Sequence, residues 1–112
     1  MRIAIPIAGS RLAMHFGHCR EFAFYDVDPT SKTITNASAE AAPDHQPGLL
    51  PRWLADRNVD LIIAGGMGSR AQALFAQSGI DVVLGATETD PQALVQQFSA
   101  GTLEQGENVC DH

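Results

Sequence analysis

Apolar residues recur along this chain with two periods, and the change of period divides it into two halves. The first half has short apolar or alternating runs that are typical of strands. The second half alternates apolar residues at helical spacing with short apolar runs, which predicts helices interleaved with strands. The predicted strands are residues 2–7, 21–27, 32–38, 60–64 and 80–84, and the predicted helices are residues 48–58, 70–78 and a third that begins at Pro91.

The order of these elements, βββαβαβα, predicts an α/β fold. Short apolar strands that alternate with helices are typical of parallel strands covered on both faces. A turn signal at residues 28–31 joins the second and third strands into a hairpin. We therefore expect a five-stranded mixed sheet with strands 1, 4 and 5 parallel, the hairpin antiparallel beside strand 1, and helices on both faces. This topology resembles that of ribonuclease H.

Three loops are expected to meet at the end of the sheet where the parallel strands finish, which we call the loop end. They are the first loop (residues 8–20), the glycine loop (65–69) and the third loop (85–87). Ligands of open α/β sheets bind outside the carboxyl ends of the strands. The loop end is therefore the predicted binding site. Ser69 and Asp90 are the predicted N-caps of the two helices that follow the glycine loop and the third loop.

The first loop contains a run of potential metal ligands, His15-Phe16-Gly17-His18-Cys19. Two imidazoles three residues apart with an adjacent thiol offer borderline and soft ligands that suit copper, zinc, iron or a cluster. In the alternative interpretation, His15 caps a turn, His18 lies at the surface and Cys19 is a small core residue.

A second group of the same kind, Cys110-Asp111-His112, ends the chain. Folded back, Cys110 and His112 would close a pocket with Cys19. Chain ends are usually frayed, so a solvated, flexible tail over residues 101–112 is the alternative.

The glycine loop follows a strand and opens a helix. Bare backbone N–H groups at a helix N-terminus hold anions, which makes Gly66, Met67, Gly68, Ser69 and Arg70 candidate binding residues. The spacing Gly66-x-Gly68-x-x-Ala71 also fits a loose dinucleotide fingerprint, although that fingerprint belongs after the first strand of a larger sheet. A tight turn that needs glycine is the alternative.

Composition describes one globular domain of 112 residues with a net charge of −6 and a pI of about 4.9. Phosphate binding requires clustered Lys and Arg, so we expect neither nucleic acid nor a membrane surface as partner. Residues 1–7 lack the long apolar core of a signal peptide and are interpreted as a strand. A cytoplasmic protein with reduced cysteines is expected, and we expect a monomer.

Only seven residues are Lys or Arg, yet three arginines fall in or beside the loops of the loop end. Arg11, Arg20 and Arg70 would make this end locally positive and suited to an anion. Met14, Phe16 and Met67 are the candidates for an apolar wall that strengthens such contacts by excluding water. Chance placement on loops is the alternative.

Hydrolytic chemistry is poorly supported by the sequence. A ribonuclease H-type reaction needs carboxylates on the central strands to hold two metal ions, and residues 3–7 contain none. No serine occupies a nucleophile elbow. We therefore expect a binding protein and no enzymatic activity.

Four motifs in order resemble the dinitrogenase iron–molybdenum cofactor biosynthesis family. They are the opening residues 1–6, the His15-Phe16-Gly17-His18 run followed by Phe22, the glycine loop, and the ending at residues 106–112. The resemblance covers essentially the whole chain. Cys19 departs from it, because many relatives have a small residue there.

The resemblance implies a protein that binds and carries an anionic metal–sulfur cluster, of the molybdenum–copper–sulfide or iron–molybdenum cofactor type. A small stand-alone member of the family holds such a molybdenum–copper–sulfide cluster without covalent attachment, and this chain is similar to it in size and motif layout. A protein that donates or accepts the cluster is the expected partner. The competing hypotheses are an enzyme, such as a nucleotide-dependent one, and a nucleotide- or anion-binding regulatory domain that acts through a protein partner.

Overall fold

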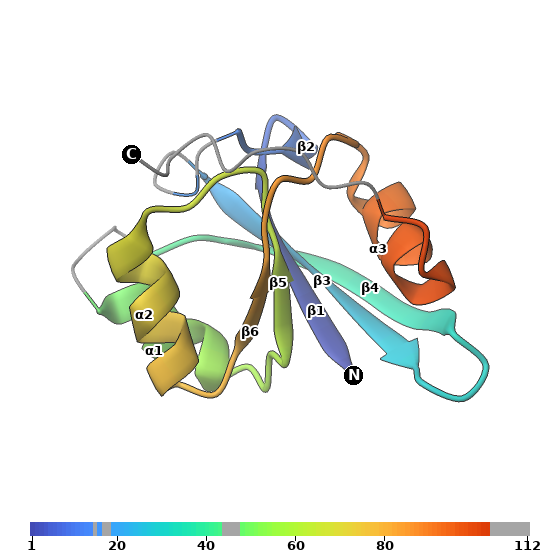
Figure 1. Ribbon diagram of the computed structural model, residues 1–112, viewed down its shortest axis with the longest axis horizontal. Helices are drawn as coiled ribbons and strands as arrows, with labels where there is room; N and C mark the ends of the chain where they lie inside the picture. Colours follow the sequence, from blue (N-terminus) through green and yellow to red (C-terminus); the bar gives the residue numbers. More distant parts are fainter. Residues whose placement is uncertain (15, 17–18, 44–47, 104–112) are drawn as a thin grey trace.

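The computed structural model describes residues 1–14, 16, 19–43 and 48–103. These residues form a mixed α/β fold (Figure 1). The strands are β1 (Arg2–Ala8), β2 (Arg11–Leu12), β3 (Glu21–Asp28), β4 (Thr33–Ala41), β5 (Leu61–Ile63) and β6 (Asp81–Val83), and the helices are α1 (Leu49–Ala55), α2 (Ser69–Gln77) and α3 (Pro91–Ala100).

The strands form one mixed sheet in the order β4-β3-β1-β5-β6. The predicted directions are confirmed, because β5 and β6 run parallel to β1, while β3 and β4 form an antiparallel hairpin beside it. The predicted count of five strands is wrong. Within the first loop the chain turns back at Gly9 and Ser10, both with positive φ, and the two-residue strand β2 pairs with the end of β1 as a sixth strand. The ribonuclease H-like description stays a prediction.

Helices cover both faces of the sheet, as predicted. Figure 1 shows α1 and α2 on one side and α3 on the other. The first face buries Leu54 and Phe75 against strand residues such as Phe22, and the second buries Leu94 and Val95. β1 is buried on both faces, which explains its continuous apolar sequence.

The helix ends differ in detail from the predicted caps. Gly68, in an extended conformation, is the N-cap of α2, and Ser69 is its first helical residue, so the prediction of Ser69 as the cap is wrong. Asp90 does occupy the N-cap position of α3, but its side chain makes no capping hydrogen bond. The carboxylate of Glu88 accepts hydrogen bonds from the N–H groups of Thr89 and Asp90 instead, each at 3.0 Å. In the part of the chain that is described, none of the helices has the length and apolar character that crossing a membrane requires.

Candidate functional site

Backbone hydrogen bonds join the three loops at the loop end. The N–H of Phe16 in the first loop donates to the carbonyl of Gly66 at 3.0 Å, and the N–H of Gly85 in the third loop donates to the carbonyl of Gly65 at 2.9 Å. The N–H of Leu12 donates to the carbonyl of Thr89 at 2.9 Å, which ties β2 to the segment before α3. The predicted meeting of these loops is therefore confirmed, with the glycine loop at the centre.

The backbone of the first loop passes close to Gly65 in the glycine loop. A Cβ atom on Gly65 would lie 3.4 Å from the carbonyl oxygen of Met14 and 3.7 Å from that of Ala13. Alanine would make ordinary contacts there, but a larger side chain would push the first loop away from the glycine loop. The contact of the two loops therefore needs a small residue at position 65, either glycine or alanine.

The glycine loop ends by presenting backbone N–H groups at the start of α2. The first of the helical hydrogen bonds runs from the N–H of Gln72 to the carbonyl of Gly68 at 3.1 Å, so the N–H groups of residues 69–71 precede the helical pattern. Gln72 also fixes the loop, because its side-chain amide donates to the carbonyl of Met67 at 2.9 Å. Gly68, Ser69 and Arg70 are exposed, whereas Gly66 and Met67 are buried beneath them. The exposed part of the loop is thus a small set of N–H donors on a fixed backbone.

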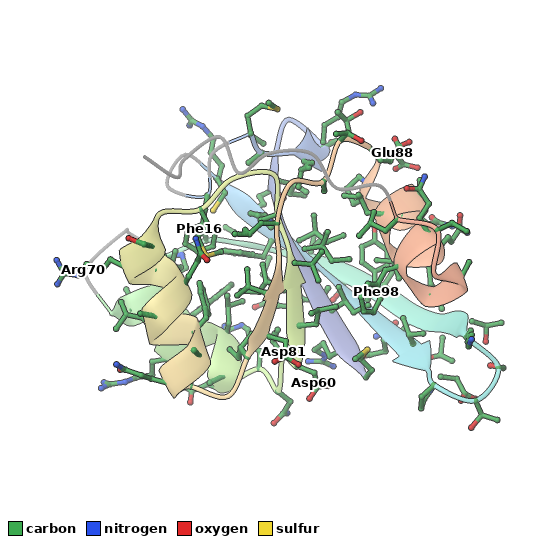
Figure 2. All side chains as sticks on the ribbon, in the orientation of Figure 1. Phe16, Asp60, Arg70, Asp81, Glu88 and Phe98 are labelled. Atoms are coloured by element: carbon green, nitrogen blue, oxygen red, sulfur yellow. The ribbon has the colours of Figure 1, made fainter. Side chains whose placement is uncertain are left out.

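Two of the three predicted wall residues belong to the core. Phe16 is 7% exposed and Met67 is fully buried. The Phe16 ring packs edge-on against Phe75, with ring centroids 5.5 Å apart, and against Phe22 at 5.9 Å. Figure 2 shows Phe16 directed inward between α2 and the sheet. Phe16 therefore anchors the first loop to the core. Of the three predicted wall residues, Met14 alone is exposed to solvent.

Cys19 lies in the same apolar cluster as Phe16 and is 5% exposed. Burial raises the pKa of its thiol to about 11. Metals bind the thiolate form, which this environment disfavours. The position of Cys19 therefore agrees with the interpretation as a small core residue, and its role as a ligand stays a prediction.

The other four predicted metal ligands, His15, His18, Cys110 and His112, lie outside the described residues. Within the described part of the chain, no group of three or more His, Cys, Asp or Glu side chains is placed to hold a metal ion. The hypothesis of direct ligation is thus neither confirmed nor contradicted.

The three arginines near the loop end, Arg11, Arg20 and Arg70, do not share a common partner. The guanidinium of Arg11 donates to the hydroxyl of Thr89 at 3.0 Å. Arg20 and Arg70 are exposed and form no ion pair with another described residue. Figure 2 shows Arg70 directed outward from α2, on the far side of the view from Glu88. The cations are therefore spread along the loop end and do not converge on one point.

Each end of the sheet carries charged side chains of both signs. Figure 2 shows Asp60 and Asp81 at the end opposite the loops. At the loop end, N–H groups of Asp90 and Thr89 together with Gln97 and Arg11 hold the pKa of Glu88 below its usual range. These contacts favour the ionised carboxylate, so the loop end carries a negative charge at Glu88 together with its exposed arginines.

Sequence reasoning missed the contacts that fix these loops. Gln72, Glu88 and Thr89 act through hydrogen bonds to backbone or to another side chain, and a polar residue without a motif gives no sequence signal for such a bond. A hollow of about 370 Å³ also opens beside the third loop, lined by Thr87, Glu88, Gln97 and Thr102. Only Thr87 of these belonged to a predicted loop.

Comparison with known families and curated proteins gives matches over nearly the whole chain. A family model described as dinitrogenase iron-molybdenum cofactor matches residues 1–101. The MJ0580 protein of Methanocaldococcus jannaschii, itself described as uncharacterized, is 31% identical over 110 residues, which cover 96% of this chain and 92% of that protein.

Solved structures share the fold. The crystal structure of PH0822 has a TM-score of 0.87 and 28% identity, and the match covers 96% of both chains. The apo form of the orange protein from Desulfovibrio gigas has a TM-score of 0.64 and 23% identity, with 96% of this chain and 93% of that chain covered. At this level of identity the second match shows likeness of fold.

Proposed function

This chain belongs to the dinitrogenase iron–molybdenum cofactor family, and from that premise we propose that it binds and carries an anionic metal–sulfur cluster at the loop end. The family resemblance read from the sequence motifs is confirmed by the family match. The small stand-alone member that the sequence resembles in size and motif layout is the orange protein, whose fold the chain shares. The cargo we propose is a molybdenum–copper–sulfide cluster or a related iron–molybdenum cluster.

The observation that carries the proposal is the exposed start of α2. Ser69 and Arg70 offer backbone N–H groups at the positive end of a helix dipole, on a loop held in place by Gln72 and by the first loop. Exposed guanidinium groups of Arg20 and Arg70 lie in or beside the same loops. The arginines do not converge on one point, so the N–H donors at the start of α2 are the part of the loop end that supports anion binding in a chain with a net charge of −6.

We propose a carrier rather than a catalyst. The donors at the loop end bind and orient an anion, and the proposal assigns them no proton transfer or nucleophilic attack. Delivery then requires a protein that donates or accepts the cluster, and a cytoplasmic location would keep Cys19 and Cys110 reduced.

Replacing Ser69 with proline tests whether the backbone donors bind the cluster. Proline is favoured at the first helical position and removes one N–H group there. The residue before it, Gly68, already has φ −65° and ψ 154°, a conformation that a following proline tolerates. We expect stability to change by less than about 0.5 kcal/mol. Affinity for a copper–tetrathiomolybdate cluster should fall about 10-fold or more, because a hydrogen bond to a charged group contributes about 1.5–3 kcal/mol.

Ser69→Ala is the matched control for this change. It removes the hydroxyl and keeps the N–H group, so its affinity should stay near that of the unchanged chain. Equal affinities for Ser69→Pro and Ser69→Ala would show that the N–H group of Ser69 does not bind the cluster.

The pH dependence of cluster affinity distinguishes two modes of binding. If His15 and His18 bind the anion as cations, affinity falls as pH rises through the reference pKa of histidine, about 6.5. A titration of cluster affinity between pH about 5.5 and 8 covers that interval. Affinity that increases over the same interval would instead indicate metal ligation by neutral imidazole, because protons compete with metal at low pH.

A further inference from the structure

We propose that the edge strand β4 pairs antiparallel with β4 of a second copy of this chain, so that two sheets join across a two-fold axis. β4 ends the sheet beyond β3, and no other strand pairs with its outer side in the described part of the chain. Eight of its nine residues are exposed, Ile34 being the exception. Figure 1 shows β4 at the border of the sheet.

The outer side of β4 is long, exposed and unpaired by any other strand in the described part of the chain. Its outer N–H and C=O groups form a template for another strand, and proteins usually protect such edges with short strands, lysine, proline or inward charges. β4 contains no lysine or proline, and its one ionised residue is Glu40. The opposite edge, β6, is only three residues long. β4 is nine residues long, and its protective features are Glu40 and the irregularity beside Asn36, so residues 36–41 remain a regular edge.

The regular part of β4 fits a second copy of itself. The register against β3 is irregular only between Asn36 and Ile34, so residues 36–41 form an uninterrupted strand. A two-fold axis at Ser38 places each Glu40 opposite the other copy's Asn36, and Ala37 opposite Ala39. The Glu40 carboxylate of each copy then faces the Asn36 amide of the other, so like charges are not opposite each other. The small side chains of the alanine pairs cause no steric conflict.

Both faces of the strand permit this pairing. Ser38 and Glu40 lie opposite Phe24 and Phe22 of β3, on the face that α1 covers. The guanidinium of Arg57 holds the Glu40 carboxylate by contacts of 2.9 and 3.3 Å, which offsets its charge where the second copy approaches. A two-fold axis perpendicular to the sheet reverses the strand direction, so the two loop ends point away from each other. The dimer therefore leaves both candidate sites open, and the pairing is independent of the proposed function.

The contact is small. Pairing about Ser38 matches residues 36–40 of the two copies, because residue 41 would meet Thr35 at the irregular position. Five paired residues span about 17 Å, and so short a strand contact buries less area than the interface of a standard stable complex. In place of the monomer expected from the sequence, we expect a weak dimer with a dissociation constant between about 10 µM and 1 mM. Sedimentation velocity should therefore show a mostly monomeric chain at about 1 µM and a sedimentation coefficient that rises with concentration toward 1 mM.

Two variants of equal charge locate the interface. Ser38→Lys places two cations face to face on the axis and should leave the chain monomeric at about 1 mM. Gln77→Lys adds the same charge at the exposed end of α2 and should dimerise like the unchanged chain. A dimer that persists in Ser38→Lys lies on another surface and overturns the proposal.

Disulfide trapping tests the same axis without relying on affinity. In a Cys110→Ser background, Ser38→Cys should cross-link rapidly under mild oxidation by diamide, because opposite Cβ atoms of an antiparallel pair lie about 5 Å apart. Gln77→Cys is the control and should cross-link slowly. Equal cross-linking rates, with a monomer at every concentration, contradict self-pairing and overturn the proposal.

Discussion

Replacing Phe16 with alanine is expected to lower the free energy of unfolding by about 3–5 kcal/mol, the range for a large buried aromatic side chain. Phe16 was expected to line a binding pocket, but its ring packs on Phe75 and Phe22 within the core. Its loss leaves a cavity under the first loop and removes the anchor of that loop. Chemical denaturation measures the loss of stability.

Met14→Ala is the matched control, because Met14 belongs to the same loop and is 59% exposed. We expect its effect on stability to stay within about 0.5 kcal/mol. If the two variants were equally stable, Phe16 would not anchor the first loop and the description of the site would be wrong.

The thiol of Cys19 is expected to react with iodoacetamide at pH 8 about 100-fold more slowly in the folded protein than in the unfolded chain. Burial raises its pKa from 9.0 to about 11, and this difference reduces the thiolate fraction by about that factor. A Cys110→Ser variant restricts the measurement to Cys19. Mass spectrometry of the alkylated protein, with and without denaturant, gives both rates.

The same shift has a consequence for stability at high pH. The unfolded chain loses the thiol proton first, so stability should be independent of this group below pH about 9 and should fall as pH rises from 9 toward 11. Rapid alkylation of the folded protein at pH 8 would show an accessible thiolate and would favour Cys19 as a metal ligand.

Much of the fold follows from the hydrophobic pattern. β1, β5 and β6 are short apolar runs, and Leu94 and Val95 mark the buried face of α3 as helical spacing predicts. The pattern did not reveal β2, since Arg11 and Leu12 are too few to show a period. The sequence also predicted Ser69 as the N-cap of α2, whereas Gly68 occupies that position. The N-cap is defined by backbone conformation, and residue type gives only a preference for it.

The location of the candidate site could be predicted from the sequence, but the orientation of its side chains could not. The carboxyl ends of the parallel strands located the three loops correctly. Residue chemistry alone gave Phe16 and Met67 as wall residues and left Cys19 as either a metal ligand or a small core residue, and all three are buried. Apolar and thiol side chains serve in cores and in pockets alike, so only packing distinguishes the two uses.

Reconstitution with copper and tetrathiomolybdate tests the central claim most directly. The apo-protein should be folded and colourless, because its core is built from apolar side chains on both faces of the sheet. Mixing should give a chromophore that co-elutes with the protein on gel filtration at a fixed ratio of metal to chain. Colour that elutes only with the small molecules would contradict the assignment of this chain as a cluster carrier.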